Sequence, residues 1–170
     1  QPLSVATGLD FYLVNAGAMN NKGIDFAVNS RVWDRELKVD LGLTLGRYIN
    51  EVTALPYDQR VTPVGKGEVI TTEGNAAAMF YGYKTDGVFS TTAEANASGL
   101  QTRGQDGSLM PFRAGDVRFI DTNNDGIIDD NDRQIIGNPN PGVFGMFSMN
   151  ASYKRFTFDA SFTFSAGNDI

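Results

Sequence analysis

The sequence of 170 residues contains neither cysteine nor histidine. Without cysteine, the chain cannot form a disulfide framework or a thiolate metal site. Without histidine, it cannot carry out Ser-His or Cys-His catalysis, bind zinc through imidazole, or use the usual proton shuttle near neutral pH. These two absences remove most hydrolase mechanisms.

Long apolar runs are also lacking, because no window approaches the roughly 18 consecutive apolar residues of a transmembrane helix. The chain opens with Gln1-Pro2-Leu3-Ser4, without a basic region or an apolar core, so we expect no signal peptide. Both ends break off abruptly, and we expect the chain to be a piece of a longer protein. Its net charge of −6 argues against a nucleic-acid partner and is compatible with a cation site.

Four segments instead alternate apolar and polar residues with period two, namely residues 24–33, 37–48, 143–153 and 156–164. The second has an unbroken apolar row at every other position from Leu37 to Leu45, and the fourth has Phe156, Phe158, Ala160, Phe162 and Phe164. A helix would scatter these residues around its surface, so the pattern predicts strands.

Short links join these segments in pairs and predict two hairpins, 23–48 and 143–165. Strands of about ten residues match tilted membrane-spanning strands, and Trp33, Tyr48 and Tyr153 stand at strand ends, where an aromatic girdle would lie. The same alternation also builds soluble sandwiches whose apolar faces pack together. The fold class is therefore all-β with antiparallel hairpins, and a membrane barrel and a sandwich are both open at this point.

Residues 50–142 connect the hairpins and lack strong periodicity, so we expect a long loop with little core of its own. Within it we expect an ordered aromatic stretch at 76–89, one helical turn at 92–97 and a short strand at 116–120. In a barrel with short periplasmic turns, this connection would be extracellular.

One segment of the connection, residues 121–132, fits the twelve-residue calcium loop. Glycine occupies position six, Ile128 supplies the apolar anchor, and Asp132 stands where an EF-hand usually has Glu. The predicted calcium ligands are Asp121, Asn123, Asp125, the backbone carbonyl of Ile127, Asp129 and Asp132. The flanks do not look like EF-hand helices, so we expect a lone loop that braces the structure. The alternative is a polar turn that binds nothing.

No enzyme is predicted, because assigning the acidic residues of this loop to calcium leaves no acid pair for a glycosidase. The aromatic residues Phe80, Tyr81, Tyr83 and Phe89 would either stack on sugar rings or pack the loop onto its own surroundings.

Several segments together resemble the SusC/RagA-type TonB-linked outer-membrane transporters. The matching motifs are NKGID at 21–25, YGYKTDGVF at 81–89, GDVRFIDTNNDG at 115–126, IGNPNP at 136–141 and GNDI at 167–170. They follow the order of the family and cover nearly the whole chain.

The resemblance implies part of a transmembrane β-barrel from the C-terminal region of a TonB-dependent receptor in a Bacteroidota-type outer membrane. It implies import of glycans or peptides, with TonB and a SusD-like lipoprotein as partners of the full-length protein. Isolated barrel strands are expected to self-associate through their edges. The rival hypothesis is a secreted, calcium-stabilised β-sandwich that binds carbohydrate, and a second rival is a fragment of a glycan-degrading enzyme.

Overall fold

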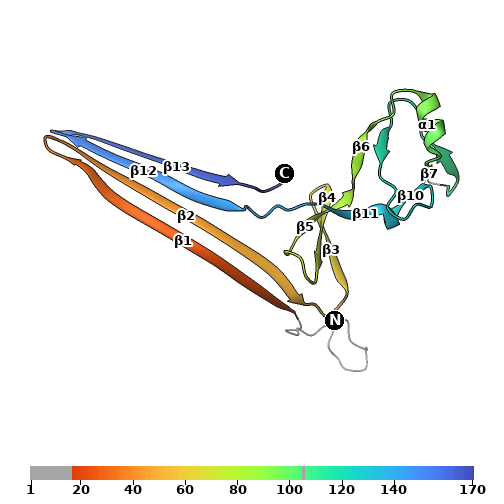
Figure 1. Ribbon diagram of the computed structural model, residues 1–170, viewed down its shortest axis with the longest axis horizontal. Helices are drawn as coiled ribbons and strands as arrows, with labels where there is room; N and C mark the ends of the chain where they lie inside the picture. Colours follow the sequence, from red (N-terminus) through yellow and green to blue (C-terminus); the bar gives the residue numbers. More distant parts are fainter. Residues whose placement is uncertain (1–16, 105) are drawn as a thin grey trace, which may run out of the picture. The chain divides into compact units, whose positions relative to one another are not determined.

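A computed structural model describes residues 17–104 and 106–170, which form mostly antiparallel strands and one short α-helix (Figure 1). Two compact units are present. The first comprises the described residues up to Arg60, with Thr71–Ala77 and Asn140–Gly167, and the second comprises Val61–Ile70, Ala78–Pro139 and Asn168–Ile170. Within the described residues, no helix has the length and apolar character needed to cross a membrane.

The first unit is built on a four-stranded antiparallel sheet with the order β1-β2-β12-β13. Its strands are β1 (Ala18–Asp34), β2 (Leu37–Ala54), β12 (Val143–Tyr153) and β13 (Phe156–Ala166). The two tight turns lie at the same end of the sheet, because Leu37 pairs with Tyr153 (Figure 1). The expected antiparallel hairpins are confirmed, and β1 and β2 are longer than the sequence pattern indicated. Tyr48 consequently lies inside β2 rather than at its end.

The strands pair in a register that keeps their alternating patterns in phase. Val28, Leu43, Phe147 and Phe162 form one cross-strand row. The next row, on the opposite face, contains Asn29, Gly42, Ser148 and Ser161. One face of the sheet is therefore apolar across all four strands, and the other is largely polar.

Close approach of neighbouring groups explains the glycine at position 145, on the apolar face of β12. A Cβ atom there would collide with the backbone oxygen of Thr44 and would lie 2.8 Å from the ring of Phe164. The Phe164 ring thus covers the space left open by the missing side chain.

The second unit contains short sheets. One has the order β11-β5-β4-β3, the second has β10-β7-β8, and the third pairs β6 with β9. The strands are β3 (Gln59–Val64), β4 (Gly67–Thr72), β5 (Met79–Tyr83), β6 (Thr85–Val88), β7 (Gln101–Arg103), β8 (Leu109–Pro111), β9 (Val117–Phe119), β10 (Ile127–Ile128) and β11 (Arg133–Gly137). The first residues of β3 and the last residues of β4 belong to the first unit.

The helix α1 (Thr92–Ser98) begins at an N-cap, Thr91, whose side chain accepts a hydrogen bond from the backbone N–H of Glu94. It ends at Gly99, whose φ of 72° is the left-handed conformation that favours glycine. Ala95 is the buried residue of this helix. The helical turn expected at 92–97 and the strand expected at 116–120 are both present.

The prediction that residues 50–142 form a loop with little core is wrong. Phe89, Ala95, Phe112 and Ile128 are buried together, and Tyr83, Leu100 and Phe119 pack against them. These residues come from short elements far apart in the sequence, so no single stretch displays the periodicity of a core-facing element. Packing therefore contributes directly to the order of this unit.

Candidate functional site

The segment 121–132 leads from β9 through β10 to a short 3-10 helix (η2, Asp130–Asp132). Asn124 and Gly126 both have positive φ, 59° and 78°, so the chain turns sharply at the glycine of position six. The backbone oxygen of Gly126 accepts a hydrogen bond from the N–H of Gln101, and Ile128 is buried in the core. The loop is thereby attached to β7 and to the core through its middle.

The side chains predicted as calcium ligands make hydrogen bonds to the backbone of the same loop. The two carboxylate oxygens of Asp121 accept from the N–H groups of Asn124 at 2.7 Å and Gly126 at 2.8 Å. Asp125 accepts from Ile127 N–H at 2.7 Å. Further along, Asp129 accepts from Asn131 N–H at 2.9 Å, and Asn123 accepts from Asp125 N–H at 3.0 Å. These bonds fix the orientation of each side chain in the loop.

Asp132 is fully buried, with 0% of its surface exposed. Its two carboxylate oxygens accept from the backbone N–H groups of Thr122 at 2.8 Å and Asp129 at 2.9 Å, and the Thr122 hydroxyl lies 3.2 Å away. Burial alone would raise the pKa of Asp132, but these hydrogen bonds to the ionised form outweigh it and hold the pKa below the usual value. The charged carboxylate therefore joins the start of the loop to its end.

No group of three or more acidic side chains converges on one point as a metal cage in residues 17–104 and 106–170. Each carboxylate oxygen that accepts one backbone N–H retains further acceptor capacity, so the same donor set is still chemically suited to a hard cation. Calcium binding by Asp121, Asn123, Asp125, Ile127, Asp129 and Asp132 stays a prediction.

The four aromatic residues considered for sugar stacking have different environments. Phe89 is 1% exposed and lies in the core, so its ring cannot contact a ligand. Tyr83 packs edge-on against Phe119 with ring centroids 5.5 Å apart, and its hydroxyl donates to Asp130. Burial, and to a smaller extent the nearby carboxylates, raises the pKa of Tyr83, so this hydroxyl stays protonated at neutral pH. Phe80 and Tyr81 are half-buried on β5.

A cluster around Arg133 was not predicted from the sequence. The Arg133 guanidinium lies 4.6 Å from the centre of the Tyr81 ring and forms an ion pair with Glu68. Asp130 lies within 3.8 Å of the same guanidinium. These residues line a hollow of about 410 Å³ with the β3–β4 turn. Glu68 and Arg133 are far apart in the sequence, and only the pairing of β4, β5 and β11 brings them together.

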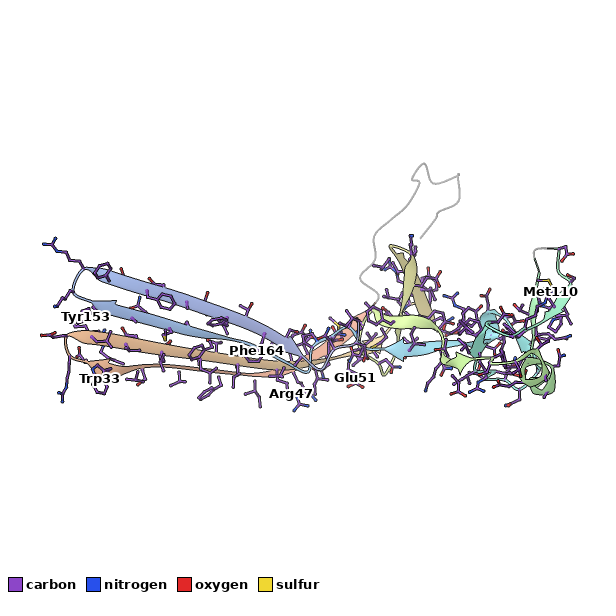
Figure 2. All side chains as sticks on the ribbon, turned by 90° about the horizontal axis from the view of Figure 1, so that it is seen from above. Trp33, Arg47, Glu51, Met110, Tyr153 and Phe164 are labelled. Atoms are coloured by element: carbon purple, nitrogen blue, oxygen red, sulfur yellow. The ribbon has the colours of Figure 1, made fainter. Side chains whose placement is uncertain are left out.

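Among the described residues of the first unit, the apolar face of the four-stranded sheet carries many exposed large side chains. Its aromatic side chains are more than half exposed at Phe26, Phe158 and Phe162, the last at 63%. Trp33 and Tyr153 both lie at the turn ends of their hairpins (Figure 2). Exposed apolar patches of this extent indicate contact with a membrane or a partner.

Comparison with known proteins finds relatives that are named TonB-dependent receptors. The chain is 28% identical over 170 residues to TonB-dependent receptor P26 of Formosa agariphila, a match to 96% of this chain and 16% of that protein. TonB-dependent receptor P3 of the same organism is 29% identical over 178 residues, a match to all of this chain and 17% of that receptor. The chain thus spans about one sixth of these relatives. No family model matches it.

Solved structures of RagAB have the same fold. The chain superposes on the RagAB peptide importer in the open-open state with a TM-score of 0.64 and 20% identity, over 99% of this chain and 17% of the other. A second structure, the RagAB peptide transporter, superposes with a TM-score of 0.62 and 20% identity, over 96% of this chain and 16% of the other. The prediction that the chain is not an enzyme is confirmed, because its homologues are receptors and transporters. The chain is homologous to one segment of TonB-dependent receptors, and its strands are arranged as in RagAB.

Proposed function

We propose that this chain forms part of the wall of a TonB-dependent transporter in the outer membrane of a Bacteroidota-type cell. The observation that carries the proposal is the register of β1, β2, β12 and β13, which places apolar rows on one face and polar rows on the other. A membrane wall needs this arrangement over the length of long antiparallel strands. The homology to TonB-dependent receptors supports the same function.

The substrate of the full-length protein is a glycan or a peptide, taken up with the help of TonB and a SusD-like lipoprotein. The RagAB structures that share this fold are named as a peptide importer and a peptide transporter. Uptake of labelled peptides and glycans by cells with and without the full-length protein would separate the two substrate classes. Co-purification of a lipoprotein with the transporter would test the partner.

Neighbouring residues on opposite faces give a sharp test of the membrane wall. Phe162→Arg places a charge on the apolar face, and Ser161→Arg places the same charge on the polar face. In the full-length protein folded into lipid vesicles, we expect Phe162→Arg to lower the unfolding free energy by about 2–4 kcal/mol and Ser161→Arg to cost much less. If both substitutions lower the unfolding free energy equally and the protein is soluble without detergent, the proposal is contradicted and the secreted sandwich is favoured.

Within the same proposal, the 121–132 loop binds one structural calcium ion, which would brace the second unit. The supporting observations are the oxygen-rich spacing and the sharp turn at Gly126. Asp125→Asn removes a ligand charge but keeps an oxygen that can accept the Ile127 N–H. Asp130→Asn, at a position that is not a predicted ligand, is the matched control. We expect calorimetry to show about one calcium ion per wild-type or control chain, and much weaker binding for Asp125→Asn. If the wild-type chain binds no calcium and its stability does not change with chelator, the proposed calcium site does not exist.

A further inference from the structure

The apolar face of the four-stranded sheet ends in aromatic side chains beside its two turns. Leu37, Tyr153 and Phe156 form the last cross-strand row of this face, and Phe156 is 79% exposed. Trp33, also more than half exposed, pairs with Val39 one row further in. Figure 2 shows Trp33 and Tyr153 close to the tip of the sheet. The face therefore carries exposed rings up to the point where its apolar surface ends.

A cation lies over one of these rings at each turn. Lys154 and Arg155 make the turn between β12 and β13, and the Lys154 ammonium is 5.0 Å from the centre of the Tyr153 ring. In the other turn, the Arg35 guanidinium is 5.9 Å from the centre of the Trp33 ring. Both distances allow cation–π attraction. Because both rings belong to the apolar face, these two charges lie on the apolar side of this end of the sheet.

No carboxylate neutralises these cations within residues 17–104 and 106–170, where neither Lys154 nor Arg35 forms an ion pair. The β12–β13 turn contains no acidic residue, whereas Arg35 stands between Asp34 and Glu36. An ammonium group that lies over a ring keeps N–H donors for a further acceptor. The charge of Lys154 is therefore the more available of the two for an external anion.

We propose that this end of the apolar face binds the phosphate group of an anionic phospholipid, with Lys154 as the main contact and Arg35 as the second. This inference rests on the proposed function, in which the apolar face is turned toward lipid. A phospholipid matches both parts of the surface, because its acyl chains suit the exposed rings and its phosphate suits the cations just beyond them. Short turns of outer-membrane barrels face the periplasm, on the phospholipid leaflet of that membrane.

Photolabelling of the full-length protein in vesicles tests the inference. The vesicles contain phosphatidylglycerol and phosphatidylcholine, and in each sample one of the two lipids carries the same photoreactive acyl chain. Mass spectrometry then measures the labelling of peptides from the two turns. We expect phosphatidylglycerol to label the β12–β13 turn about fivefold more than phosphatidylcholine, as for one cation near an anionic lipid surface. Lys154→Gln should remove most of this preference, and Arg35→Gln should lower the preference at the other turn.

Lys38→Gln is the matched control, because Lys38 lies at the same end of the sheet but in the polar row with Asp34, Ser152 and Thr157. It removes the same charge and should leave the preference unchanged. Inorganic phosphate, added at constant ionic strength, should not change the preference either.

Four outcomes would overturn the inference: equal labelling of the turns by the two lipids, a preference that Lys154→Gln leaves unchanged, equal losses for Lys154→Gln and Lys38→Gln, or a preference that inorganic phosphate abolishes. In each of these cases lipid still labels the apolar face, so the membrane wall stands. If neither lipid labels this face, the proposed function itself is contradicted.

Discussion

At the scale of single residues, Asp132 closes the 121–132 loop with one buried carboxylate. Asp132→Asn keeps the shape but places an amide NH₂ group toward a backbone N–H, which leaves one buried donor without an acceptor. We expect a loss of about 1–3 kcal/mol in the unfolding free energy of the second unit. Chemical denaturation in the presence of a chelator measures this loss without any contribution from bound metal.

The matched control is Asp130→Asn, because the Asp130 side chain is 90% exposed in the same short helix. We expect its effect to stay within about 0.5 kcal/mol. If both variants lose the same stability, the hydrogen bonds of Asp132 do not close the loop.

The spacing of residues 121–132 predicted the turn at Gly126 and the burial of Ile128 as an apolar anchor. It did not predict that the carboxylates of Asp121 and Asp132 accept from backbone N–H groups, because the same oxygen-rich pattern serves calcium and Asx-type turns equally well. The cluster around Arg133 could not be predicted from the sequence either, because its ion pair with Glu68 joins strands that are distant in the chain.

At the scale of elements, Gly145 sets how closely β12 can pair with β2. Gly145→Ala would push a methyl group against the Thr44 carbonyl and the Phe164 ring. We expect a cost of about 1–3 kcal/mol, as for other overpacked positions, with faster amide hydrogen exchange along β12. Gly67→Ala should cost much less, because the atom closest to a Cβ there, Val64 O, is 3.9 Å away.

The core of the second unit depends on Phe89. Phe89→Ala would leave a cavity between Ala95, Phe112 and Ile128 and should cost about 3–5 kcal/mol. Hydrogen exchange followed by mass spectrometry should show lost protection in the second unit and unchanged protection in β1 and β2. Val88→Ala, at a neighbour that is 55% exposed, should change little. Unchanged protection around Phe89 would mean that the unit is held together in another way.

The long strands were predictable because their alternation is sustained over many residues and is unbroken on one face. The short strands of the second unit were not, because runs as brief as β10 or β7 carry no period of their own. Tertiary pairing and the shared core decide their conformation. The same reason explains why the sequence placed the end of β2 near Tyr48, whereas pairing with β1 continues to Ala54.

At the scale of the whole molecule, β1 and β13 are the edge strands of the four-stranded sheet. We expect the isolated chain to self-associate in detergent through these edges, since unpaired strand edges recruit further strands. Sedimentation over a range of concentrations would show assembly. Thr163→Lys on β13 should weaken this assembly, because a charged side chain on an edge strand hinders pairing with a further strand.

Thr44 occupies the same cross-strand row as Thr163 but lies on the interior strand β2. Thr44→Lys is therefore the control with the same change on the same face. Equal effects of the two lysines would point to association through the faces of the sheet instead of its edges.

The placement of residues 55–142 also has an evolutionary consequence. This insertion leaves the sheet after β2 and rejoins it at β12, and these two strands are direct neighbours. Lengthening, shortening or exchanging the insertion therefore requires no change in strand order and breaks no pairing between the long strands. Descendants of one ancestral sheet could therefore acquire different inserted units by recombination at this junction, while selection on the long strands continued separately.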